Sequence, residues 1–250
     1  MRPMRVVSPY RPFEPESPAH RRLGPFDWVA ALRMLADTVR RSNGCETMAL
    51  TDEAAHVGGL PAFRRPTAEP RLMLWILEAS LGYLRSDAFD RDTVMVSPDN
   101  LVLGDLRHHF AGDLGILVRT REKYHNRPIL NAVQWWPVAS KAALAGFYAR
   151  ALDEARGLHE SLIRWGADSE SLRILVAPIA CGVHRRAGLD VAMIEAVTVL
   201  HSIPDRTALD LGTGRRPRFP PVPVIDFKGE RKRHMAAFYA ALRPSAAGAA

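Results

Sequence analysis

Carboxylate and lysine side chains stand at the ends of apolar runs in two distant segments of this 250-residue sequence. One apolar run ends in a short turn that contains Ser97 and Asp99, and another ends at Asp226, with Gly229 and Lys232 following. Carboxylate oxygens suit Mg²⁺ or Mn²⁺, a lysine adds a mobile positive charge, and a glycine lets the backbone approach a bulky anion. These residues could therefore hold a divalent cation beside a phosphate-bearing ligand. The structural alternatives are a turn aspartate at 99 and a solvated strand end before a basic helix.

Two further polar residues lie between these segments. Asn131 belongs to the strand-like run 128–136, and Asp168 precedes a helical pattern at 169–175. Amide and carboxylate oxygens can stabilise a sugar carbon that becomes positively charged as its bond breaks. The alternatives are a buried aromatic strand, which does not explain Asn131, and a helix N-cap at Asp168, which is compatible with a role in a site.

In their order along the chain, these segments resemble the motifs of GT-A glycosyltransferases. Residues 92–106 resemble the Asp-x-Asp metal motif, although Ser97 replaces its first aspartate. Residues 128–136 resemble the family strand with an asparagine near the donor sugar, which Asn131 matches, and residues 165–172 resemble a helix start whose aspartate Asp168 matches.

The last segment resembles the His-x-x-Gly-x-x-Lys motif of retaining members, such as the glycogenin-like and bacterial galactosyltransferase-like group. Gly229 and Lys232 match it, and Asp226 replaces the histidine. The resemblance implies that Asp99 and Asp226 hold Mn²⁺ or Mg²⁺, and we infer that Asp226 offsets the carboxylate lost at Ser97. It also implies that Gly229 and Lys232 meet the diphosphate of a nucleotide-sugar.

The same resemblance implies catalytic positions beside the sugar and a nucleoside pocket near the N-terminus. The catalytic candidates are Asn131 and Asp168. The residues expected to bind the base, the ribose or the donor are Ser8, Pro9, Tyr10, Asp52 and Arg71.

We therefore expect a metal-dependent hexosyltransferase that uses a UDP-sugar and retains the anomeric configuration. One acceptor to consider is a hydroxymethylated pyrimidine base in phage-type DNA, which the enzyme would flip out of the stack. The alternative acceptor is a cell-surface saccharide or a lipid-linked glycan. An alternative of another class is a non-catalytic nucleic-acid-binding protein in which Asp99 and Asp226 are structural.

Apolar periodicity and punctuation by proline and glycine predict the elements that position these residues. Strands are expected at 5–10, 46–50, 93–96, 100–103, 114–118, 130–138, 191–194, 197–200 and 224–227. Helices are expected at 26–41, 71–84, 141–158, 169–175 and 232–242, with loops at 11–25 and 208–223.

Strands that alternate with helices predict a three-layer α/β fold of GT-A type, with a mainly parallel central sheet and a Rossmann-like N-terminal half that binds the nucleotide. We expect one domain over 1–243 and a disordered tail at 244–250. In such sheets the ligand lies at the carboxyl ends of the strands, which would bring 8–11, 51–52 and 97–100 together.

The net charge of +7 and a pI near 9.9 come mostly from paired arginines. They favour a polyanionic partner such as DNA, although an arginine-rich solvated surface explains them equally well. Two isolated cysteines, Cys45 and Cys181, fit a reducing cytoplasm. No segment reaches about 18 uninterrupted apolar residues, so we predict no membrane span. The glycine-rich nucleotide loops and the Gly-x-Ser-x-Gly elbow are also absent from the sequence.

Overall fold

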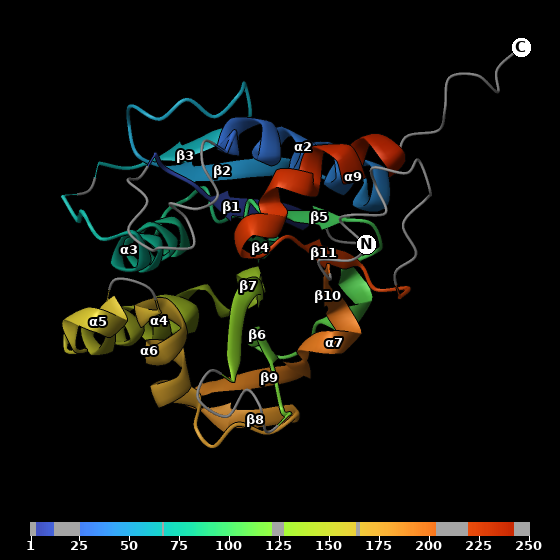
Figure 1. The fold of residues 1–250 in the computed structure, drawn as a ribbon. Helices are drawn as coiled ribbons and strands as arrows, with labels where there is room; N and C mark the ends of the chain where they lie inside the picture. Colours follow the sequence, from blue (N-terminus) through green and yellow to red (C-terminus); the bar gives the residue numbers. More distant parts are fainter. Residues whose placement is uncertain are drawn as a thin grey trace, which may run out of the picture.

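A computed structural model describes residues 4–12, 26–66, 68–121, 128–163, 166–203 and 220–242 of the chain. Its centre is an eight-stranded sheet (Figure 1). The strand order across the sheet is β3 (Ala62–Arg64), β2 (Thr47–Thr51), β1 (Met4–Pro9), β4 (Asp92–Val96), β7 (Ile129–Trp136), β6 (Leu114–Val118), β9 (Leu189–Glu195) and β8 (Gly182–Arg186). A second, three-stranded sheet has the order β10 (Leu200–Ser202), β11 (Val224–Asp226) and β5 (Asn100–Val102).

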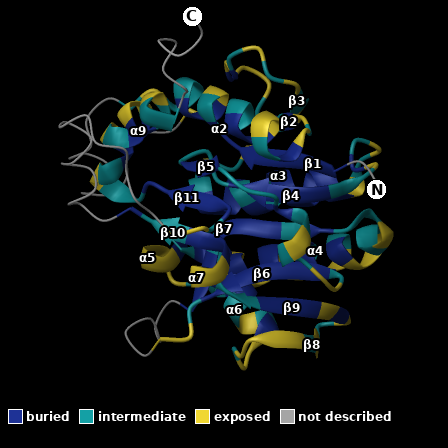
Figure 2. Ribbon diagram, turned by 90° about the vertical axis from the view of Figure 1, so that its right-hand side faces the viewer, coloured by how far each residue is buried: buried dark blue, intermediate teal, exposed yellow. Residues whose placement is uncertain are grey.

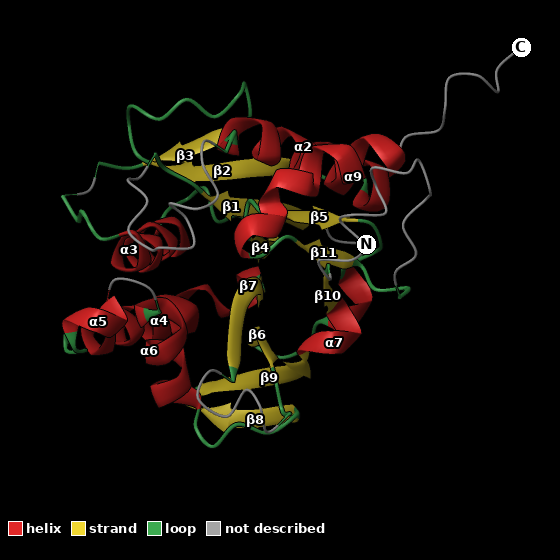
Figure 3. Cartoon of the chain, in the orientation of Figure 1, coloured by secondary structure: helices red, strands yellow, loops and turns green. Residues whose placement is uncertain are grey.

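Helices cover both faces of the large sheet, which confirms the predicted three layers (Figures 1 and 3). One side carries α3 (Leu72–Arg85), α4 (Lys141–Arg156), α5 (Glu160–Ile163) and α6 (Ala167–Val176). The other side carries α2 (Trp28–Asn43), α7 (Ala196–Val199), α9 (Met235–Leu242) and the small sheet. Short 3₁₀ helices are η1 (Arg107–His109), η3 (Val138–Ser140) and η5 (Gly229–His234).

Burial on both faces explains why the first strands are apolar at successive positions. Val6 and Val7 are both fully buried, but Val6 packs in the cluster that contains α2, and Val7 packs with α3 and α4. Parallel strands covered by helices on both sides have this pattern. Figure 2 shows the consequence, with buried central strands and the exposed edge strand β8.

The sheet is parallel from β3 through β1 to β4, and β6 pairs in parallel with β9. Two strands run against this direction: β7 pairs antiparallel with β4 and β6, and β8 pairs antiparallel with β9. The predicted, mainly parallel GT-A-type sheet is confirmed, and β7 brings its amino end to the edge where β1, β4 and β6 end.

Most predicted elements are present with small shifts at their ends, but one prediction was wrong. Residues 197–200 do not form a strand, since α7 covers Ala196–Val199 and only Leu200 begins β10. The Thr198 hydroxyl donates to the Glu195 carbonyl (2.8 Å), and Ala196 and Val199 are buried while Val197 is 50% exposed. Burial at a spacing of three residues belongs to a helical turn.

Other differences concern elements that the sequence pattern did not reveal. The short strand β3, the edge strand β8 and the helix α5 were not predicted. The helix predicted for 232–242 begins as the 3₁₀ helix η5 and becomes α-helical at Met235. Most of the predicted loops at 11–25 and 208–223, and the tail 244–250, lie outside the described residues. The single domain over 1–243 stays a prediction.

None of the helices in the described ranges combines the length and the apolar character that a membrane span requires.

Candidate functional site

Two adjoining cavities lie at the edge of the sheet where β1 and β4 end and β7 begins. The larger has a volume of about 480 Å³ and the smaller about 170 Å³. The residues that line both are Met73, Ser97, Asp99, Asn131, Asp168 and Lys232. Asp226 and Gly229 line the larger cavity, and Pro9 and Tyr10 line the smaller one. Most of the sequence-predicted site residues therefore meet in one place.

Pairing of β5 with β11 brings Asp99 and Asp226 together from distant parts of the chain. Asp226 lies opposite Asn100 in this antiparallel pair, and the N–H of Phe227 donates to the carbonyl of Asp99 (3.0 Å). The small sheet thus holds one carboxylate at the start of β5 and the other at the end of β11, both facing the larger cavity.

Lys232 forms an ion pair with Asp99, with 2.5 Å between Nζ and Oδ2. Its side chain is only 6% exposed, and its Nζ lies 5.4 Å from the ring centroid of Trp28. Lys232 belongs to η5, which begins at Gly229, and the φ of 57° at Gly229 lies in the left-handed region that glycine adopts without strain. The ammonium group is therefore held beside the carboxylates.

Asp226 is 1% exposed, and its environment disfavours the charged form. Burial raises the pKa of Asp226 to about 6, and the negative charge of Asp99 acts in the same direction. The Lys228 ammonium (3.7 Å from Oδ2) and the Ser202 hydroxyl (2.9 Å from Oδ2) partly oppose this rise. A further positive charge at this point would lower the electrostatic cost of two neighbouring carboxylates.

The two carboxylates fit a hard divalent cation that also binds a diphosphate. In the part of the chain that the structure describes, no three His, Cys, Asp or Glu side chains form a complete ligand cluster. Mg²⁺ commonly takes only one or two carboxylates from a protein and completes its shell with phosphate oxygens and water. Asp99 and Asp226 supply such a pair.

Asn131 and Asp168 form a second polar pair, in which Asn131 Nδ2 donates to Asp168 Oδ2 (2.5 Å). Asp168 also accepts the N–H of Ser169 (2.7 Å). Burial raises the pKa of Asp168, while these hydrogen bonds favour its charged form. The Oδ1 of Asn131 is buried without a hydrogen-bond partner in the structure. The residue Asn131 lines both cavities.

The N-cap interpretation of Asp168 was wrong. The cap of α6 is Gly166, and Asp168 is the second residue of the helix. Its carboxylate lies in the first turn, where the positive end of the helix dipole favours negative charge.

The predicted nucleoside residues are only partly brought together. Pro9 and Tyr10 line the smaller cavity, whereas Ser8 is fully buried behind them. Asp52 accepts the N–H of Ala55 (3.1 Å), and Arg71 forms hydrogen bonds to both carboxylate oxygens of Glu69 (2.7 and 3.0 Å). Neither Asp52 nor Arg71 lines either cavity, so their contact with a donor stays a prediction.

Other residues line the cavities without having been predicted. Trp28 and Arg11 form part of the smaller cavity, and Arg119 part of the larger one. Trp28 is the first residue of α2 and follows closely on the predicted loop 11–25, and this position was the available signal in the sequence.

No protein-family model matches the chain, and no curated protein sequence matches it. The chain has a GT-A-type fold, and the solved structures described below that share it are glycosyltransferases. This agrees with the resemblance found in the sequence motifs.

Three of these structures illustrate the similarity. The galactosyltransferase LgtC, solved with donor and acceptor sugar analogues, has a TM-score of 0.56 and 12% identity over 97% of this chain and 98% of LgtC. A glycosyltransferase involved in the glycosylation of the PBCV-1 major capsid has a TM-score of 0.54 and 9% identity over 94% and 99%. GlyE of Streptococcus pneumoniae TIGR4 has a TM-score of 0.58 and 11% identity over 96% of this chain and 60% of GlyE.

Proposed function

We propose that the protein transfers a hexose from a UDP-sugar to an acceptor hydroxyl, with a divalent cation held by Asp99 and Asp226. The main support for this proposal is the meeting of two carboxylates and Lys232 in one cavity, although Asp99 is far from Asp226 and Lys232 in the sequence. The GT-A-type fold supports the same reaction class.

The chemistry that such a site must perform is departure of a nucleoside diphosphate from a sugar. When bound, Mn²⁺ or Mg²⁺ would supply a Lewis acid that neutralises charge growing on the diphosphate. Lys232 adds a second positive charge at the same place, and exchanges its partner Asp99 for a phosphate oxygen when donor binds. The glycine backbone at 229 leaves room for the phosphates.

Asn131 and Asp168 lie where the sugar would sit, on the wall that both cavities share. In this proposal the unpartnered Oδ1 of Asn131 stabilises the sugar carbon that becomes cationic, and the hydrogen bond from Nδ2 to Asp168 orients the amide. Asp168 accepts the hydrogen bond of this amide. This arrangement supports stabilisation of an oxocarbenium-like carbon, as in glycoside hydrolysis.

The match of Gly229 and Lys232 to the retaining motif, with Asp226 in place of its histidine, supports retention of the anomeric configuration. For the acceptor, the net charge of +7 supports a hydroxymethylated pyrimidine in DNA. A cell-surface saccharide or a lipid-linked glycan is the alternative acceptor. If no donor is turned over but DNA binds, the protein is instead a nucleic-acid-binding protein.

A donor screen by mass spectrometry tests the proposal. The purified protein with Mn²⁺ is mixed with each UDP-sugar, alone and with hydroxymethylated DNA or simple saccharides. We expect UDP release from at least one donor and loss of that release in Asp99→Ala and Asp226→Ala. Asp87→Ala is the matched control, because Asp87 is exposed and lines neither cavity. Failure to bind UDP or to hydrolyse any UDP-sugar would contradict the proposal.

A further inference from the structure

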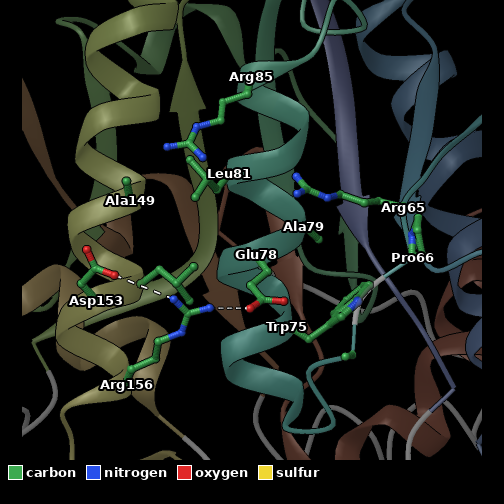
Figure 4. Close-up of a pocket in the computed structure, with 12 residues that line it drawn as sticks. Arg65, Pro66, Trp75, Glu78, Ala79, Leu81, Arg85, Ala149, Asp153 and Arg156 are labelled. Carbon is green, nitrogen blue, oxygen red and sulfur yellow. Dashed lines mark hydrogen bonds and ion pairs between the residues drawn. The ribbon is translucent and has the colours of Figure 1, made fainter.

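A third cavity, of about 520 Å³, lies along α3, with residues of α4 on one side and Arg65, Pro66 and Ala68 among its other lining residues (Figure 4). It shares no lining residue with the two cavities of the candidate site. Its walls combine apolar side chains with three arginines and two carboxylates. The proposed transfer reaction does not use any of them.

One arginine already neutralises both carboxylates. Arg156 Nη2 lies 2.8 Å from Glu78 Oε1, and its Nη1 lies 3.8 Å from Asp153 Oδ1. Figure 4 shows this bridge between α3 and α4. Arg156 therefore offsets part of the negative charge of the cavity.

Arg65 and Arg85 supply the excess positive charge. Both are exposed, and within the described ranges neither side chain has a hydrogen-bond or ion-pair partner. Arg65 lies across α3 at Gly82, since a Cβ on Gly82 would be 2.8 Å from the Cδ of Arg65. Arg85 is one turn further along the same helix. Two guanidinium groups that repel each other thus line the same cavity, an arrangement that a bound anion would stabilise.

A buried donor adds to this pattern. Trp75 lines the cavity and is 1% exposed, and its Nε1 is buried without a hydrogen-bond partner in the structure. The guanidinium of Arg11 covers the indole ring, with Cζ 5.2 Å from the centroid. Because an indole N–H can only donate, the group that satisfies it must be an acceptor.

We propose that this cavity is a second binding site, for a ligand that has a phosphate or carboxylate group and an apolar portion. Arg65 and Arg85 would bind the anionic group, and Trp75 would donate one hydrogen bond to the ligand. Leu81, Leu152 and the neighbouring alanines would contact the apolar portion. The proposal is independent of the transfer reaction, because it concerns other residues and another cavity.

The test is a titration of the ¹⁵N-labelled full chain, followed at the indole N–H resonance of Trp75, which Trp75→Phe assigns. Phenyl phosphate, benzoate and neutral benzyl alcohol are added at constant ionic strength. We expect a saturable shift with one or both anions and none with benzyl alcohol. The comparison of phenyl phosphate with benzoate distinguishes the two anionic groups.

Substitutions then show whether the arginines form the site. The double variant Arg65→Gln/Arg85→Gln is expected to weaken binding by about tenfold or more, as loss of charge-assisted hydrogen bonds predicts. Gly82→Ala should also weaken it, because the new methyl group displaces Arg65 without removing its charge. Arg150→Gln is the matched control, since Arg150 is an exposed arginine of α4 that does not line the cavity.

Two results would overturn the proposal. One is a Trp75 resonance that no anion shifts. The other is an unchanged affinity in the double variant, which would place the anion in the donor cavity instead. UDP release should be the same in all these arginine variants, so a failure of the proposed transfer activity remains distinguishable from a failure of this site.

Discussion

Asp226 illustrates how a residue can be unfavourable for the fold and suited to binding a cation. It is buried beside a second carboxylate, and its only hydroxyl hydrogen bond in the described structure comes from Ser202. A buried charge is tolerated when it is paired or bound to a metal. The sequence placed Asp226 in a motif, and the structure supplies the reason why an aspartate is useful there.

At the same scale, Asp226→Asn and Asp99→Asn should each lower kcat by about 100-fold or more, since each removes a charge that stabilises the cation at the leaving group. Steady-state UDP release at saturating donor measures this effect. Asp87→Asn is the control. An activity within about twofold of the wild type in both variants would exclude them as the cation ligands.

Asn131→Ala should lower kcat by about 100-fold to 1,000-fold and leave the KM for the donor almost unchanged. The reason is that a preorganised oxygen acts on charge that exists only in the transition state. Donor titrations that separate kcat from KM provide the measurement. A large rise in KM at unchanged kcat would instead assign Asn131 to binding of the ground state.

At the scale of elements, Asp113 joins the β8–β9 hairpin to the start of β6. Its carboxylate accepts the N–H of Asp190 (3.0 Å) and the hydroxyl of Ser140 (2.6 Å). The hydrogen bond from Asp190, which has the larger effect, and the one from Ser140 hold the pKa of Asp113 below its ordinary value. The charged carboxylate therefore stabilises the folded state.

Asp113→Asn should consequently lower Tm at neutral pH, because the new amide presents a donor where acceptors are needed. A carboxyl with a lowered pKa stabilises the fold above its unfolded pKa of about 3.9. This contribution is lost as pH falls through the lower pKa of the folded state. Thermal unfolding from pH 7 to pH 3 should show the difference between variant and wild type shrinking. If the Tm difference between variant and wild type stays constant from pH 7 to pH 3, the loss of stability does not come from the charge of Asp113.

A polar contact attaches the helix α9 to α2. The hydroxyl of Tyr239 donates to Asp37 Oδ2 (2.6 Å), and Cζ of Arg41 lies 5.4 Å from the centroid of the Tyr239 ring. Loss of one such hydrogen bond costs about 1 kcal/mol, which lowers Tm by about 2–4 °C in a chain of this size. Differential scanning calorimetry of Tyr239→Phe tests this value, and an unchanged Tm would show that apolar packing alone holds α9.

At the scale of the whole molecule, ligand binding should stabilise the fold only when all parts of the site are present. At about 100 times its Kd, a ligand adds about 2.7 kcal/mol, which corresponds to roughly 5–10 °C in Tm. UDP with Mn²⁺ should therefore raise Tm, and the shift should disappear with EDTA. A shift that survives EDTA would show that Lys232 and its neighbours bind UDP without a metal.

The sequence alone predicted the three layers, most helices and strands, and Asp99, Asn131, Asp168, Asp226 and Lys232 as one set. Apolar periodicity and short-range motifs are local properties, so they can be read without the fold. The sequence also indicates that β7 runs antiparallel to β6. Only residues 119–128 separate β6 from β7, too few for the crossover that a parallel pair requires.

Which polar residues share a cavity depends on the tertiary structure. Asp99 and Asp226 meet because β5 pairs with β11, and this pairing depends on long-range backbone hydrogen bonds that no local pattern encodes. For the same reason, Asp52 and Arg71 looked equivalent to Tyr10 in the sequence but have hydrogen-bond partners outside the two cavities. Residue types established what chemistry was available, and strand pairing determined where those residues could act together.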